Sequence, residues 1–163
     1  MMLKPQKPLI ISALFTAMTV VLTSFVQIPT GNGYIHPGDS VIYLASCILP
    51  FPYAIFTAII GGALSDALTG YVVFIIPTII IKALITLPYT TKNEKILTIR
   101  NAIMTIPAGA ITVVGYFIAG WILYGWSGAV IELLGNAIQA VGSAVLFLML
   151  ATILDKIRFK QNL

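Results

Sequence analysis

The sequence predicts an all-α protein: a polytopic membrane bundle of six transmembrane helices whose N- and C-termini are both cytoplasmic. Hydrophobic residues make up 59% of the chain and charged residues only 9%, so a water-soluble globule would expose large apolar patches. Long apolar stretches separate three basic clusters, which are Lys4 and Lys7, then Lys92, Lys95 and Arg100, then Lys156, Arg158 and Lys160. Because basic residues concentrate on the cytoplasmic side of membrane proteins, the clusters mark that face.

The first half of the chain contains three predicted spans. Residues 8–28 are apolar and long enough to cross a hydrocarbon core of about 30 Å. The stretch from Asp39 to Gly70 is too long for one span, and Pro50-Phe51-Pro52 interrupts it, so we expect helices at 39–50 and 53–69. A single span there would place the first and last basic clusters on opposite sides of the membrane, against the positive-inside bias.

The second half contains three more predicted spans, at 71–88, 102–124 and 127–154, with a basic cytoplasmic connection at 89–100. The segment 29–38 holds three glycines, two prolines and no lysine or arginine, which predicts a loop on the outer face. The spans and their turns occupy most of the 163 residues. We therefore expect one integral membrane domain, 1–163.

Polar residues within the spans gather toward the outer face. Glu132, Asn136 and Gln139 are spaced i, i+4, i+7 and share one helix face, which should look into the bundle or a wet cavity. Asp39 opens span two and Asp66 closes span three. Hydrogen bonding between packed helices is the competing explanation for such residues, and N-capping is the competing role for Asp39.

Three further residues in the spans could serve packing or function. Lys82 is the basic residue inside a span, and its ammonium either snorkels to the interface or forms a salt bridge. Ala13 and Ala17 form a small-xxx-small element in the first span, which permits close contact with another helix. Such spacing is common in membrane helices.

The sequence motifs of several common enzyme classes are absent from the chain. The chain has no G-x-x-x-x-G-K-[ST], G-x-S-x-G, H-E-x-x-H or C-x-x-C, so ATP hydrolysis and nucleophilic or metal-dependent catalysis are poor hypotheses. Cys47 and His36 are the single cysteine and histidine, which argues against a disulfide and a metal site. The net charge of +4 follows topology rather than nucleic-acid binding. We expect no cofactor and no enzyme activity.

The chain resembles the S components of energy-coupling factor (ECF) transporters, the small six-span vitamin-binding subunits of prokaryotic ABC importers. The resemblance covers nearly the whole chain. It is carried by Ala13-Leu14-Phe15-Thr16-Ala17, Tyr34-Ile35-His36-Pro37-Gly38-Asp39, Gly61-Gly62-Ala63-Leu64-Ser65-Asp66-Ala67-Leu68-Thr69-Gly70-Tyr71, Gly115-Tyr116 and Asn136-Ala137-Ile138-Gln139. The part ending Asp66-Ala67-Leu68-Thr69-Gly70 is the most specific.

The resemblance implies a multi-pass protein of the prokaryotic plasma membrane that binds a small vitamin near the outer side. Ala13 and Ala17 would dock on a transmembrane coupling subunit, through which two ATPase subunits supply energy. The substrate-binding candidates on that picture are Tyr34, His36, Asp39, Asp66, Tyr116, Glu132, Asn136 and Gln139. Within the family the chain looks closest to the branch that handles hydroxymethylpyrimidine or pyridoxine, with riboflavin and pantothenate left open.

Two other functions compete with this hypothesis. A small membrane assembly protein would use its polar residues only to hold helices together. An intramembrane enzyme would use Asp66 and Glu132 as an acid–base pair, although no nucleophile is evident beside them.

Overall fold

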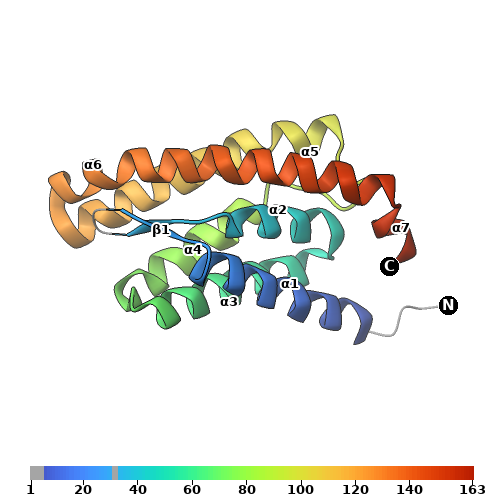
Figure 1. Ribbon diagram of the computed structural model, residues 1–163, viewed down its shortest axis with the longest axis horizontal. Helices are drawn as coiled ribbons and strands as arrows, with labels where there is room; N and C mark the ends of the chain where they lie inside the picture. The colour runs from blue at the N-terminus through green and yellow to red at the C-terminus, as the bar shows by residue number, and fades with distance from the viewer. Residues whose placement is uncertain (1–5, 31–32) are drawn as a thin grey trace.

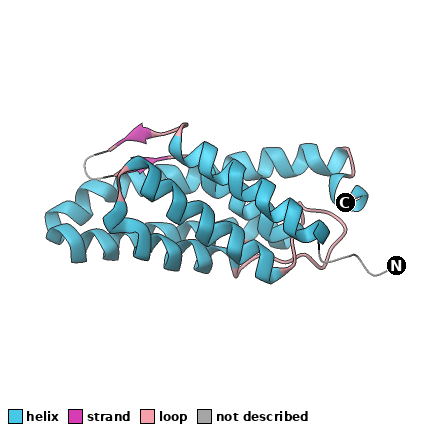
Figure 2. Cartoon of the chain, turned by 90° about the horizontal axis from the view of Figure 1, so that it is seen from below, coloured by secondary structure: helices cyan, strands magenta, loops and turns pink. Residues whose placement is uncertain are grey.

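The computed structural model describes residues 6–30 and 33–163, and within them the chain is an elongated bundle of helices (Figure 1 and Figure 2). Lys4 of the first basic cluster and residues 31 and 32 of the outer loop lie outside the described residues. The elements are α1 (Gln6–Ser24), β1 (Ile28–Pro29), β2 (Tyr34–Ile35), α2 (Gly38–Ile48), α3 (Phe51–Thr69), the 3₁₀ helix η1 (Val72–Phe74), α4 (Ile75–Thr86), α5 (Ile99–Ile103), α6 (Thr105–Lys156) and α7 (Phe159–Asn162).

Helix α6 folds back on itself at Gly125, where the backbone leaves the helical region with φ 77° and ψ −179°. Such positive φ values favour glycine because it has no Cβ. The predicted break between residues 124 and 127 therefore falls where the chain reverses. In Figure 1 this bend lies at the same end as the β1–β2 hairpin, whereas α5, α7 and the start of α1 lie at the opposite end.

Within residues 6–30 and 33–163, three helical stretches are long and apolar enough, by length and composition, to cross a membrane: Gln6–Ser24, Phe51–Thr69 and Ile99–Lys156. The reversal at Gly125 divides the last into two passes. Two shorter apolar helices, Gly38–Ile48 and Val72–Thr86, complete the bundle. The all-helical membrane bundle expected from the sequence is therefore confirmed.

Helix α2 lies at the centre of the bundle. Every residue from Gly38 to Cys47 is buried, and α2 contacts α1, α3, α4 and α6. The other helices expose large apolar side chains, such as Leu14, Ile76 and Val141, on their outer faces. Protein rather than lipid therefore surrounds α2.

The outer connection is more ordered than the sequence indicates. Helix α1 ends at Ser24 rather than continuing to Ile28. Pro29 disfavours helical backbone at Ile28, the residue before it. Residues Ile28 and Pro29 instead pair antiparallel with Ile35 and Tyr34. The segment 29–38 that was predicted as a loop thus contains the second residue of β1, the whole of β2 and the first residue of α2.

Helices α3 and α4 approach closely at Gly62. A Cβ added there would lie 2.7 Å from Thr78 Cγ2 and 3.0 Å from Lys82 Cγ. A larger residue would force α4 away from α3. This glycine therefore allows α4, which carries Lys82, to pack directly against α3.

Candidate functional site

A small cavity of about 40 Å³ lies at the hairpin end of the bundle. Its walls come from the hairpin, α3, η1 and both passes of α6. The lining residues are Gly33, Tyr34, His36, Asp66, Tyr71, Phe74, Tyr116, Glu132, Asn136 and Gln139. The structure therefore brings seven of the eight sequence-predicted binding residues to one hollow, and Asp39 is the exception.

Asp66 supplies a carboxylate to this cavity from the last turns of α3. The side chain is 6% exposed, and its Oδ1 accepts a hydrogen bond from Tyr34 Oη at 3.2 Å. Its Oδ2 is buried and has no hydrogen-bond partner among the residues that the structure describes. A buried acceptor without a partner is costly, so this atom suits a donor group on a ligand.

Aromatic rings form much of the remaining wall. Tyr34 lies 4.9 Å from Tyr71 between ring centroids, and Phe74 lies 6.3 Å from Tyr116. The Tyr116 hydroxyl is 3.1 Å from Thr78 Oγ1, within hydrogen-bonding distance. Rings in such positions offer flat, polarisable surfaces to a planar ligand.

The polar face of α6 points to the cavity as its spacing predicts. Glu132, Asn136 and Gln139 are 7%, 7% and 4% exposed and all line the hollow. Glu132 Oε2 accepts a hydrogen bond from Thr30 Oγ1 at 2.8 Å, which ties the hairpin to this helix. These groups face the interior of the bundle, and none of the three is exposed to lipid.

Asp39 lies beside the cavity wall, behind Gln139, and forms a buried ion pair. Its Oδ1 is 2.5 Å from Lys82 Nζ, and its Oδ2 accepts a hydrogen bond from Gln139 Nε2 at 3.0 Å. Asp39 is fully buried and Lys82 is 2% exposed. Lys82 therefore forms the salt bridge and does not snorkel. The capping role considered for Asp39 was wrong, because Pro37 occupies the N-cap of α2 and Asp39 lies within its first turn.

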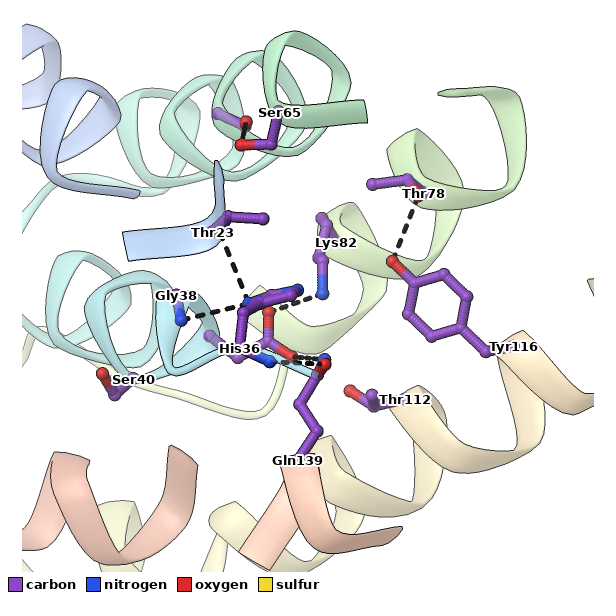
Figure 3. Close-up of polar contacts among 12 residues, drawn as sticks. Thr23, His36, Gly38, Ser40, Ser65, Thr78, Lys82, Thr112, Tyr116 and Gln139 are labelled. Carbon is purple, nitrogen blue, oxygen red and sulfur yellow. Dashed lines mark hydrogen bonds and ion pairs between the residues drawn. The ribbon is translucent and has the colours of Figure 1, made fainter. Parts of the chain in front are cut away.

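Gln139 joins this ion pair to the hairpin. Its Oε1 accepts from the backbone N–H of His36 at 3.3 Å, while its Nε2 donates to Asp39 (Figure 3). An amide is the side chain that can accept on one side and donate on the other. Gln139 is therefore held at both ends of its amide group.

His36 is neutral in this setting. Burial, and then the charge of Lys82, lower the pKa of His36 to about 3. Its Nδ1 accepts a hydrogen bond from the backbone N–H of Gly38 at 3.1 Å and lies 3.4 Å from Thr23 Oγ1 (Figure 3). The imidazole thus fixes the turn into α2 and presents its ring to Tyr34, 5.5 Å away.

The predicted docking residues lie elsewhere, on the outside of the bundle. Ala13 and Ala17 are both exposed on α1. They line a groove of about 710 Å³ between α1 and α3, whose other residues include Tyr53, Phe56 and Ile60. The groove is separate from the cavity, because the two have no lining residue in common.

Sequence reasoning missed Tyr71 and Phe74 as wall residues. They follow the turn at Gly70, where φ is 84°, and so emerge next to Asp66. Their position directly after the segment ending Asp66-Ala67-Leu68-Thr69-Gly70 was the feature of the sequence that could have indicated this role. Among the described residues, no group of three or more His, Cys, Asp or Glu side chains is arranged to hold a metal ion.

Comparison with known proteins agrees with this geometry. The family model for the S component of the ECF-type riboflavin transporter matches residues 5–156. A curated relative from Pyrococcus woesei, an uncharacterized protein in the gap 3′ region, is 30% identical over 137 residues, or 80% of this chain and 88% of the relative. Together with the helical membrane bundle, the match to nearly the whole length shows that the chain belongs to the family of ECF-type riboflavin transporter S components.

Proposed function

We propose that this S component captures a small heteroaromatic vitamin or precursor, of the hydroxymethylpyrimidine or pyridoxine type, at the outer face of the prokaryotic plasma membrane. Partner subunits would then drive its uptake with ATP. One observation carries the proposal: Asp66 Oδ2 is a buried acceptor without a protein partner among the described residues, on the wall of a cavity lined by aromatic rings. A planar ring with a hydrogen-bond donor at its edge satisfies both features.

The polar groups around the cavity support a ligand that both donates and accepts. Asp66 and Glu132 accept, whereas the amides of Asn136 and Gln139 can do either. An aminopyrimidine or a hydroxylated pyridine carries donors and acceptors around one ring. The described residues of the cavity wall include no lysine or arginine, which argues against a ligand with several negative charges.

The volume of the cavity favours a ligand with a single ring over one with three fused rings. At about 40 Å³ it exceeds the ~10–15 Å³ that a water requires and is smaller than the ~150 Å³ cavity that accepts benzene. A ligand therefore has to widen it, and a single six-membered ring requires less widening than the fused rings of a flavin. Riboflavin, the vitamin in the family's name, is the competing ligand.

Direct binding measurements test the proposal. Purified protein is analysed by mass spectrometry for a co-purified compound and then titrated with hydroxymethylpyrimidine, pyridoxine, riboflavin and pantothenate, using the fluorescence of Trp121 and Trp126. We expect a single-ring compound to bind with the lowest Kd. Tightest binding of riboflavin would overturn the substrate class, and absence of any ligand would favour the assembly protein.

The first variant is Asp66→Asn, which removes the charge but keeps the shape. Since a hydrogen bond to a charged group contributes about 1.5–3 kcal/mol, the Kd should rise by about 10- to 100-fold. Asp155→Asn is the matched control, because Asp155 lies outside the cavity and bonds to the backbone of Ile96 and Leu97. An unchanged Kd in Asp66→Asn would contradict the role of this carboxylate.

We further propose that the α1–α3 groove is the surface that docks on the transmembrane coupling subunit, which carries two ATPase subunits. Ala13 and Ala17 leave this groove open to a partner helix, because small side chains allow backbones to approach. Bulky side chains here should block docking without touching the vitamin site.

Ala13→Leu combined with Ala17→Leu should abolish vitamin uptake in cells that contain the coupling subunits, with the Kd of the purified S component unchanged. Ala110→Leu is the control, since Ala110 is also exposed but lines the groove between α4 and α6. Equal loss of uptake in the control, or loss of binding in the double variant, would refute this assignment.

A further inference from the structure

A second hollow lies directly beside the vitamin cavity. It is a groove of about 470 Å³, bounded on one side by residues 25–28 and 35–37 and on the other by residues of α6 between 138 and 143. Most of its wall is apolar, with Phe25, Ile28, Ile35 and Ile138 among the contributors. The groove is thus more than ten times the volume of the cavity.

Two residues, His36 and Gln139, belong to the walls of both hollows. They therefore form the partition between them. Of the two, His36 is anchored through the hairpin backbone and the turn into α2, whose Gly38 N–H bonds to its ring. Gln139 instead reaches across from α6 by its side chain alone.

The Gln139 side chain is kept in this position by its two bonds. It accepts from His36 N–H at 3.3 Å and donates to Asp39 Oδ2 at 3.0 Å. Because Asp39 is itself paired with Lys82, the partition rests on a charged group buried in the bundle (Figure 3). Swinging Gln139 aside would leave two buried polar groups short of a partner.

We propose that Gln139 is a specificity-determining residue that closes the vitamin cavity against the neighbouring groove and so limits ligands to a single ring. The inference rests on the proposed function and adds a physical reason for its substrate class. A ligand with further fused rings would need the groove, and the Gln139 amide blocks the way. Shortening this side chain joins the two spaces.

The test compares the Kd for riboflavin with the Kd for the single-ring compound that binds the wild type. In Gln139→Ala the Kd for riboflavin divided by the Kd for the single-ring compound should fall by about tenfold or more, a discrimination typical of pocket shape. Gln139→Asn keeps an amide but loses one methylene, so it should shift the ratio in the same direction by less. It also guards against a Gln139→Ala protein that does not fold.

A substitution at Gly142, which lines the groove but not the cavity, tests whether the groove holds the additional rings. A Cβ added there meets no atom within 4 Å, so Gly142→Phe fills the groove without a clash at its root. In the Gln139→Ala background it should restore the wild-type ratio, and alone it should leave single-ring binding unchanged. Restoration would show that the gained affinity comes from the groove rather than from a loosened cavity.

The outcomes separate the two proposals. A wild type that binds riboflavin in preference to any single ring contradicts the substrate class and, with it, the size limit. A wild type that selects a single ring, while both Gln139 variants keep the same ratio, contradicts the partition alone. A lowered ratio that Gly142→Phe does not reverse also overturns it.

Discussion

The two ends of the bundle use buried polarity in different ways. At the hairpin end, carboxylates, amides and hydroxyls surround a cavity, and one oxygen of Asp66 is left without a protein partner among the described residues. At the opposite end, called the basic end because it carries the basic residues of α5 and α7, aromatic side chains fill the interior. Tyr43 stacks on Tyr89 with 5.1 Å between ring centroids, and Phe147 meets both rings edge-on. One end thus keeps polar groups around a cavity, where we propose the ligand binds, and the other is packed with aromatic rings.

At the basic end, the side chains of Asp155 and Lys160 form hydrogen bonds with backbone groups. Asp155 accepts hydrogen bonds from the N–H groups of Ile96 and Leu97, both at 2.8 Å. Lys160 Nζ donates to the carbonyls of Thr91 and Asn93. These contacts hold the long connection between α4 and α5 against the end of α6 and against α7. We therefore expect changes here to affect folding and to leave the proposed vitamin site unchanged.

The largest expected effect comes from breaking the ion pair next to the cavity. Lys82→Met should lower the free energy of unfolding by about 3–5 kcal/mol, because it leaves Asp39 charged and unpaired in the bundle. Lys82→Met with Asp39→Leu should regain much of that loss, since no isolated charge remains. Unfolding of the purified variants in detergent measures both. A double variant as unstable as the sum of the two single variants would contradict the pairing.

A smaller effect is expected at the basic end. Asp155→Ala removes the acceptor of two backbone N–H groups and should cost about 1–3 kcal/mol of stability. Vitamin affinity should not change, because Asp155 takes no part in the cavity wall. Parallel unfolding and binding titrations check this division, and a matching rise in Kd would show that the two ends are coupled.

The smallest effect is expected for Tyr89→Phe. The Tyr89 hydroxyl is buried and has no hydrogen-bond partner among the described residues, whereas its ring packs on Tyr43 and Phe147. Removing the hydroxyl should change the free energy of unfolding by less than about 0.5 kcal/mol, or raise it, since a buried unsatisfied group is lost. Destabilisation well beyond that would mean that a bound water serves the hydroxyl.

The fold was accessible from the sequence because the relevant signals are local. Apolar runs, the proline break near residue 50 and the glycine at 125 each indicate a helix or its end without reference to the rest of the chain. The shared face of Glu132, Asn136 and Gln139 follows from helical periodicity alone. The binding and docking roles of the residues remain proposals.

Features that depend on distant residues meeting were not accessible. Lys82 and Asp39 are 43 positions apart, and nothing local indicates that α2 and α4 bring them together. The same is true of Gln139, whose two partners lie about a hundred residues earlier. Packing of whole helices decides these contacts, so the sequence left both alternatives for Lys82 open.

The enclosure of α2 has a consequence for the membrane around the protein. A helix that touches lipid must match the thickness of the hydrocarbon layer, or tilt and distort it. Helix α2 is exempt, because its residues from Gly38 to Cys47 are covered by other helices. Changes in lipid composition or growth temperature should therefore strain the outer helices first, while Asp39 keeps its depth relative to its neighbours.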